Sequence, residues 1–177
     1  MNLFALALFF ALAVGTSTAQ TTMEQLREAL DTDERVWTVQ RTFERIDDKG
    51  KHTCVYALRG TLEGNEYQFE QWYKHGERWV RHPLHGRLSQ KGNNAVLTVS
   101  QEKGANGLAY KLLFWDKTRS CGILQFTDKD DDRIKCELHV WEPALRNLGS
   151  TYPCETEYEQ FCGDQKYPVY TPACMYN

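Results

Sequence analysis

The residues best suited to chemistry lie in the last third of the chain. Cys121-Gly-Ile is followed by Glu137-Leu-His, then by Cys154, and finally by Cys174 near the C-terminus. Glu137 falls on a segment with the pattern of a strand. A carboxylate aimed into a small β-barrel would balance the charge of a cationic ligand, because a buried charge needs a partner. These residues indicate a ligand carrier rather than a catalyst.

Other motifs do not support catalysis or metal binding. The sequence contains no Gly-x-Ser-x-Gly, Walker loop or His-Glu-x-x-His. The acidic run 128–132 resembles a calcium loop, but Arg133 and His139 stand where that loop needs Gly and Glu, so we interpret it as a solvated turn. His82 and His85 have no third ligand nearby in the sequence and fit a loop. We therefore predict no enzyme activity, no metal and no cofactor.

The N-terminal segment predicts export. It contains no charged side chain and holds an apolar run from Leu3 to Val14, too short to span a bilayer, before the small residues Ser17 and Ala19. We therefore predict a signal peptide over residues 1–19, a single domain over residues 20–177, and a secreted, extracellular protein. The six cysteines all follow residue 19 and predict three disulfides, whose pairing stays open.

The charge of the chain argues against two classes of partner. Its formal net charge is −3, and its arginines are scattered among acidic residues rather than gathered into a run. Nothing electrostatic favours binding to nucleic acid or to an anionic membrane. We expect a monomer whose partner is a small molecule.

Hydrophobic periodicity predicts the elements that position these residues. Segment 36–45 alternates with a period of two, and one face carries Trp37, Val39, Arg41 and Phe43. Segments with similar patterns between Gly, Asn and Asp turns predict seven further strands: 52–60, 66–74, 78–82, 95–101, 108–116, 121–127 and 134–141. The expected fold is all-β, an eight-stranded up-and-down antiparallel barrel with room for one small ligand.

Two short helices are expected at the flanks of this barrel. Segments 23–30 and 154–162 place apolar residues at helical spacing. We expect both helices to pack outside the barrel or across one of its ends. Pro168 and Pro172 predict a tail that is extended rather than helical.

These residues resemble the secreted salivary lipocalins of ticks, the group that includes histamine-binding and serotonin-binding proteins. The opening strands are similar at Thr42-Phe43 and at His52-Thr-Cys54-Val, and the tail at Thr171-Pro-Ala-Cys174. The biogenic-amine signature of these proteins has a Cys followed by Asp and an aliphatic residue, then Glu-Leu-aromatic, then another Cys. In this chain it reads Cys121-Gly122-Ile123, Glu137-Leu138-His139 and Cys154.

The resemblance implies a lipocalin barrel and a disulfide pattern. Cys121 is expected to pair with Cys154, and Cys54 with Cys174. With those pairs formed, Cys136 and Cys162 remain for each other.

The chain departs from the signature at two positions. Gly122 replaces the Asp that helps to neutralise an amine, and His139 replaces the expected Trp or Tyr. Trp141 lies two residues further along the strand, so Glu137, His139 and Trp141 are expected to face the same way.

The resemblance also implies the residues of an amine pocket. Glu137 is the first choice for the carboxylate that balances the ammonium, and Asp31 is the second because it precedes the first strand. Aromatic faces attract a cation by about 0.5–2 kcal/mol. The candidate walls are Trp37, Phe43, Tyr56, Phe114 and Trp141; the alternative for each ring is a plain core position.

Three functions follow as hypotheses. The first is sequestration of a small host mediator, with histamine or serotonin as the leading class. The second is binding of a lipid mediator such as a leukotriene or fatty acid, with Arg41 as the inward anchor in place of Glu137. The third is an anti-haemostatic or anti-complement protein that binds other proteins through its outer loops and has a filled barrel.

Overall fold

The computed structural model describes residues 20–146 and 148–176, so the predicted signal peptide lies outside the described residues. The elements are α1 (Met23–Leu30), β1 (Val36–Arg41), β2 (Ile46–Asp47), β3 (Gly50–Glu63), β4 (Glu66–His75), β5 (Arg78–Lys91), β6 (Asn94–Ser100), β7 (Leu108–Asp116), β8 (Cys121–Thr127), β9 (Ile134–Trp141), α2 (Glu142–Leu145), α3 (Glu155–Cys162), β10 (Tyr167–Pro168) and the 3-10 helix η1 (Pro172–Met175).

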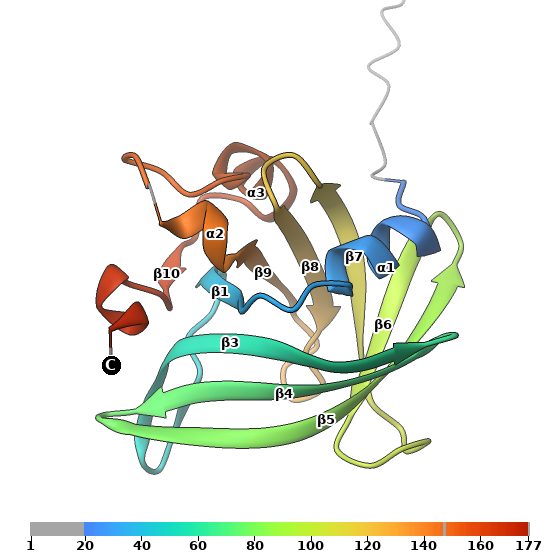
Figure 1. Ribbon diagram of the computed structural model, residues 1–177, viewed down its shortest axis with the longest axis horizontal. Coiled ribbons are helices and arrows are strands. Elements are labelled where there is room, and N and C mark those ends of the chain that lie inside the picture. Colours follow the sequence, from blue (N-terminus) through green and yellow to red (C-terminus); the bar gives the residue numbers. More distant parts are fainter. Residues whose placement is uncertain (1–19, 147, 177) are drawn as a thin grey trace, which may run out of the picture.

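Eight of these strands close into an antiparallel barrel (Figure 1). β3 to β9 pair in sequence order. β1 completes the ring because it pairs with β9 on one side and, through Val36 and Trp37, with β3 on the other. β10 adds to β1, and β2 forms a small hairpin with β3. The predicted eight-stranded up-and-down barrel is confirmed.

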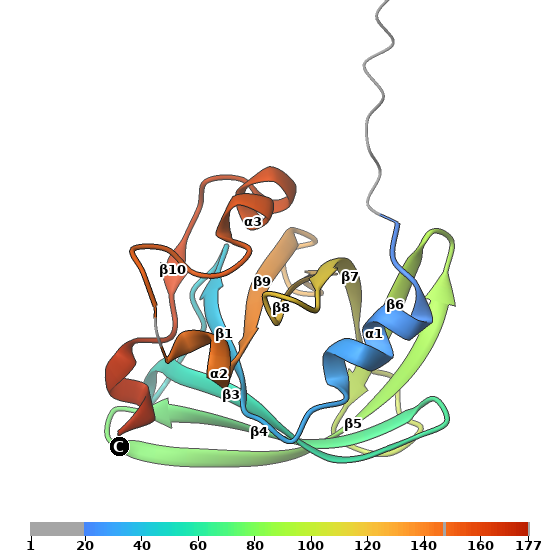
Figure 2. The ribbon, with the colours of Figure 1, turned by 45° about the horizontal axis from the view of Figure 1, so that its top comes forward.

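The first helix packs on the barrel as a short amphipathic element. Thr22 caps α1 by accepting a hydrogen bond from the backbone N–H of Gln25, whose side chain in turn accepts one from the N–H of Thr22. Leu26 is fully buried on its inner side. α1 contacts β5, β6 and β7 (Figure 2) and therefore covers part of the barrel interior.

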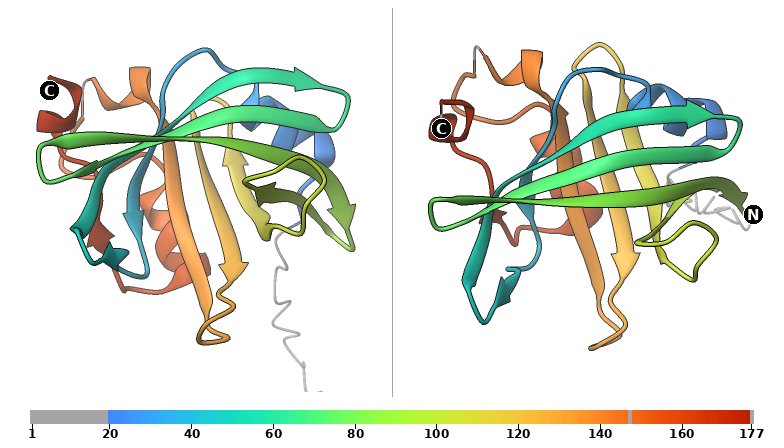
Figure 3. Two further views of the ribbon diagram at one scale, coloured as in Figure 1. Left: turned by 90° about the horizontal axis from the view of Figure 1, so that it is seen from below. Right: turned by 60° about the horizontal axis from the view of Figure 1, so that its bottom comes forward.

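Local pattern predicts the bounds of α1, β7, β8 and β9 correctly, whereas β5 is much longer than predicted. Pro83 has no backbone N–H, which made residue 82 the expected end of this strand. In the structure Pro83 pairs only with Glu70 of β4, because the β5–β6 pairing begins at His85. Proline is tolerated where a strand has an open edge, so β5 continues and, with β3 and β4, forms the long curved strands in Figure 3.

β1 is buried on both faces, unlike the amphipathic strand predicted for this segment. Its pairing with β9 shifts between Thr38 and Gln40, which inserts one extra residue. Such a bulge reverses the faces of the residues that follow. Arg41 therefore lies opposite Glu137 and does not share a face with Trp37, which corrects the assignment made from the alternation.

A second apolar cluster lies outside the barrel, under the C-terminal segment that gathers on one side in Figure 1. Three disulfides fasten that segment to β3, β8 and β9, and they are the pairs implied by the resemblance: Cys54–Cys174, Cys121–Cys154 and Cys136–Cys162. Each bridge typically contributes about 2–4 kcal/mol. The bridges hold the C-terminal segment against the outer face of the barrel and leave the interior open.

The C-terminal tail is less extended than predicted. β10 is a short strand that contains Pro168, but the segment from Pro172 forms the helix η1. Proline is favourable in the first turn of a helix, because the backbone N–H that it lacks would not be hydrogen-bonded there. α2 was not predicted, and α3 begins one residue later than expected. No helix in the ranges 20–146 and 148–176 has the length and apolar character needed to cross a membrane.

Candidate ligand-binding site

The barrel encloses a cavity of about 400 Å³ beside α1. Leu26, Ala29 and Leu30 of α1 contribute to its wall, and most of the other lining side chains are aliphatic or aromatic. Pockets for small molecules have volumes of about 300–1,000 Å³ and mainly apolar walls. The cavity therefore has the size and character of a small-ligand site.

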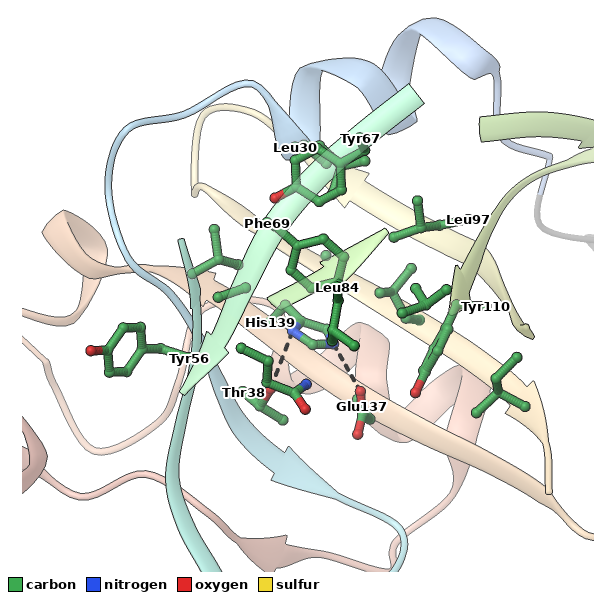
Figure 4. Close-up of a pocket in the computed structure, with 18 of the residues that line it drawn as sticks. Leu30, Thr38, Tyr56, Tyr67, Phe69, Leu84, Leu97, Tyr110, Glu137 and His139 are labelled. Atoms are coloured by element: carbon green, nitrogen blue, oxygen red, sulfur yellow. Dashed lines mark hydrogen bonds and ion pairs between the residues drawn. The ribbon is translucent and has the colours of Figure 1, made fainter. Parts of the chain in front are cut away.

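β4 supplies an aromatic wall that the sequence analysis did not single out. Tyr67, Phe69 and Tyr73 line the cavity together with Gln71, which lies between them. The rings of Tyr67 and Phe69 stack with centroids 4.7 Å apart, and Figure 4 shows them across the cavity from His139. The alternation of these residues within the predicted strand 66–74 is the signal that would have identified them.

β9 places Glu137, His139 and Trp141 along the cavity, in agreement with their alternation. Glu137 Oε1 accepts a hydrogen bond from Arg41 Nε at 2.7 Å, and both side chains are almost fully buried. Burial by itself raises the pKa of the Glu137 carboxyl, but Arg41 and His139 lower it more, so its pKa lies well below the ordinary value. Glu137 is therefore an ionised carboxylate whose charge Arg41 already balances.

His139 is a second polar side chain of β9 in this region. Its Nδ1 lies 3.4 Å from Thr38 Oγ1, and its Nε2 lies 3.2 Å from Glu137 Oε2 (Figure 4). The latter contact has the distance of an ion pair but not the direction of a hydrogen bond, so the buried Nε2 has no hydrogen-bond partner. An unsatisfied buried polar atom costs about 1–3 kcal/mol, which a ligand atom placed against it would recover.

The charges around the cavity are few. Among the described lining residues, Glu137 is the one carboxylate and Arg45 is the one guanidinium. Burial raises the pKa of Tyr110 far above its ordinary value, and the negative charge of Glu137 adds to the effect, so this hydroxyl stays protonated. With Arg41 counted as the partner of Glu137, Arg45 is the guanidinium that remains in the lining, and its side chain is exposed to solvent at the edge of the cavity.

A group of imidazoles lies at one edge of the cavity, where β2, β3 and β4 meet. His52 lines the cavity, stacks on Tyr73 with centroids 4.1 Å apart, and places its Nε2 2.9 Å from Asp47 Oδ2. Burial holds the pKa of His52 below its ordinary value, although the contact with Asp47 opposes this. The same contact lowers the pKa of Asp47 to about 2. His75 Nε2 lies 3.1 Å from the same Asp47 oxygen.

The aromatic residues proposed from the sequence divide between the two sides of the barrel. Trp141 lines the cavity, and Tyr56 borders it, although in Figure 4 the Tyr56 ring points away from the other labelled side chains. Trp37 does not line the cavity: it packs outside the barrel against Tyr170, at 5.1 Å between centroids. Phe43 lies beyond the end of β1, where its ring packs against Phe126.

The structure also places Asp31 and Phe114 away from the cavity. The side chain of Asp31 is 61% exposed and lies 3.4 Å from Arg59. The β7–β8 pairing shifts between Leu112 and Phe114, so Phe114 faces outward toward Phe161 of α3. These two residues were proposed from the sequence, and neither is among those that line the cavity.

Trp115 takes the inward position that had been assigned to Phe114. Its ring lies 5.3 Å from that of Trp141, and its Nε1 donates a hydrogen bond to Glu28 at 2.7 Å. A Cβ atom on Gly122 would lie 3.2 Å from the Trp115 ring. Trp115 therefore occupies the space that the aspartate of the amine signature would enter.

An eight-stranded antiparallel barrel around a mainly apolar cavity defines a lipocalin-like fold, the class of proteins that hold small ligands inside the barrel. The family model described as tick histamine binding protein matches residues 16–176, and the chain belongs to this family. A comparison with curated proteins finds no match.

Two solved structures of similar fold illustrate the range of occupants. The crystal structure of AM182 in complex with serotonin has 19% sequence identity and a TM-score of 0.60 over 84% of this chain and 91% of that chain. Japanin from Rhipicephalus appendiculatus, bound to cholesterol, has 16% identity and a TM-score of 0.53 over 82% of this chain and 98% of that chain.

Proposed function

We propose that the protein is a secreted, non-enzymatic carrier that sequesters a small host mediator in the barrel cavity. The observation that supports this most is the cavity itself, an apolar space of about 400 Å³ with a few polar atoms at one end. Such a carrier acts by mass action: bound ligand is removed from the free pool. The hypothesis of a protein that acts through its outer loops expects a filled barrel, and the cavity does not support it.

The charge balance of the polar end favours a ligand with an uncharged or anionic polar group, such as a fatty acid or a sterol. The related fold holds serotonin in one protein and cholesterol in another, so the fold does not choose between these classes. Arg45 lines the cavity without a carboxylate of the lining left to pair with it, since Glu137 is bonded to Arg41. A ligand carboxylate would meet Arg45, whereas a hydroxyl would meet Arg45 or His139 Nε2, which lies beside Glu137 and has no hydrogen-bond partner.

A biogenic amine is the second candidate, because Glu137, His139 and Trp141 of the amine signature do line the cavity. An ammonium bound to Glu137 would have to displace Arg41 or share the carboxylate with it. Leaving a buried charge without its partner costs about 3–5 kcal/mol. Amine binding at Glu137 is therefore less favourable than binding of a neutral or anionic amphiphile.

Titration calorimetry distinguishes these classes. Oleate, cholesterol, histamine and serotonin are titrated into protein secreted from cells that express the full chain. We expect saturable binding of oleate or cholesterol and much weaker binding of both amines. Arg45→Gln should weaken oleate binding by about tenfold, equivalent to about 1.4 kcal/mol. Arg78→Gln changes an exposed arginine outside the cavity and should have no effect.

Two outcomes would contradict this assignment. Tight histamine or serotonin binding that is lost in Glu137→Gln would establish the amine class. It would also show that the ligand replaces Arg41 as the ion-pair partner of Glu137. Absence of binding for all four ligands would count against the carrier function for these ligand classes.

A further inference from the structure

Asp47, His52 and His75 converge at the edge of the barrel although they come from three strands. β2 and β3 form a hairpin in which Asp47 pairs with Gly50. His52 follows two residues later on β3 and lies directly opposite His75 of β4. Strand register therefore brings a carboxylate and two imidazoles together, and no sequence motif predicts the cluster because His75 is distant from the other two residues along the chain.

The three side chains direct their ligand atoms at one point. Asp47 Oδ2 lies 2.9 Å from His52 Nε2 and 3.1 Å from His75 Nε2, and all three ligand atoms lie within 4.8 Å of one another. The side chain of His75 is 10% exposed, and its buried Nε2 has no hydrogen-bond partner despite the short distance to Asp47. The cluster thus contains a buried nitrogen, His75 Nε2, that lies close to a carboxylate but forms no hydrogen bond with it.

We propose that Asp47, His52 and His75 bind a divalent transition-metal ion, with Zn²⁺ as the ion that best fits the ligands. Zn²⁺ binds imidazole nitrogen and carboxylate oxygen at about 2.0–2.2 Å. Two atoms at that distance lie about 3.3–3.6 Å apart when they make the tetrahedral angle at the metal. The nitrogen–oxygen separations of 2.9 and 3.1 Å are a few tenths of an ångström shorter, so the exposed Asp47 side chain has only a small distance to move when the ion binds. Three protein ligands leave a fourth position for water.

The surroundings orient these ligands as an outer shell of a metal site does. The backbone N–H of Lys49 donates to Asp47 Oδ1 at 2.9 Å, which leaves Oδ2 for the imidazoles. Tyr73 stacks on His52 with an angle of 9° between the rings and restricts its rotation. Such outer-shell contacts hold metal ligands in place and typically change metal affinity by about 10- to 100-fold. Neutral histidine and ionised aspartate are the forms that ligate a metal.

A plain hydrogen-bonded cluster is the competing explanation. One carboxylate oxygen can accept a hydrogen bond from each imidazole, and exposed acidic groups often lie near histidines. That account leaves His75 Nε2 unsatisfied, because its contact with Asp47 lacks the direction of a hydrogen bond. A metal ion satisfies both nitrogens and the shared oxygen at once, and for that reason we favour it.

Zn²⁺ titration of the chelator-treated, untagged protein, followed by calorimetry, tests the site. We expect one ion per molecule. Asp47→Asn and His75→Gln should each weaken Zn²⁺ binding by more than about 100-fold, since a direct ligand contributes at least as much as an outer-shell group. Asp48→Asn and His85→Gln should bind as the wild type does, because Asp48 neighbours the site without belonging to it and His85 is not part of the cluster.

Thermal unfolding of each variant without metal checks that the barrel is intact, and Asp47 lies on an exposed hairpin where substitution is tolerated. The proposal is wrong if the wild type binds no Zn²⁺ at millimolar concentrations. It is equally wrong if His75→Gln and Asp47→Asn, both folded, bind Zn²⁺ as tightly as the two control variants.

Discussion

At the scale of single residues, the pair of Arg41 and Glu137 sets the electrostatics of the cavity. Both are buried and joined at 2.7 Å, so neither presents an unbalanced charge to a ligand. Arg45 and His139 are then two of the lining groups that can recognise a polar end. This arrangement makes the polar end a donor surface rather than a cation site.

The stability of this pair can be measured by substitution. Glu137→Leu leaves the guanidinium of Arg41 buried without a partner and should lower the free energy of unfolding by about 3–5 kcal/mol. Arg41→Met combined with Glu137→Leu removes both charges and should recover most of that loss. Urea unfolding followed by circular dichroism gives the values. Equal destabilisation in the single and double variants would show that packing, not charge, holds these residues.

The same pair predicts an acid-sensitive stability. Because the pKa of Glu137 is lower in the folded protein than its ordinary value of 4.5, the unfolded chain binds a proton more readily. The contribution of Glu137 is complete above its unfolded pKa and is lost as the pH falls below about 4.5 toward the lower folded value. Urea midpoints between pH 7 and pH 3 should fall less for the Arg41→Met, Glu137→Leu variant than for the wild type.

At the scale of elements, strand pairing decides which side chains enter the cavity. Local periodicity was sufficient for α1, β7, β8 and β9 and for the inward direction of Glu137 and Trp141. It failed for Arg41 and Phe114, because the bulges that precede them reverse their faces and depend on the partner strand. The Arg41–Glu137 pair and the Asp47 cluster could not be predicted for the same reason, since they depend on register between distant strands.

α1 illustrates how one element shapes the site. Leu26 is fully buried and lines the cavity, so Leu26→Ala should cost about 2–5 kcal/mol of stability and enlarge the space beneath the helix. Glu24→Ala, on the exposed side of the same helix, should change stability by less than about 0.5 kcal/mol. Thermal unfolding compares the two. Equal losses of stability in the two variants would show that the buried face of α1 does not fasten the helix to the barrel.

At the scale of the whole molecule, the stabilising contacts and the ligand space are separated. The outer cluster and the three disulfides lie on the side covered by the C-terminal segment, while the cavity lies inside the barrel. A barrel with an open interior has less core to stabilise it, and covalent bridges offset that loss. Removal of a disulfide should therefore lower stability without changing ligand binding.

Removal of one bridge tests this separation. Cys54–Cys174 closes the longest loop, with a sequence separation of 120, and the double change Cys54→Ala, Cys174→Ala should lower stability by about 2–5 kcal/mol. The dissociation constant for the cavity ligand, measured well below the unfolding temperature, should stay unchanged. Loss of binding in the folded variant would show that the tail contributes to the site.

A crystal structure of the protein with oleate tests the central claim most directly. We predict that the hydrocarbon chain lies in the cavity among the rings of β4 and that the carboxylate lies within hydrogen-bond distance of Arg45, with the Arg41–Glu137 pair intact. An empty cavity, or oleate bound only outside the barrel, would contradict the account.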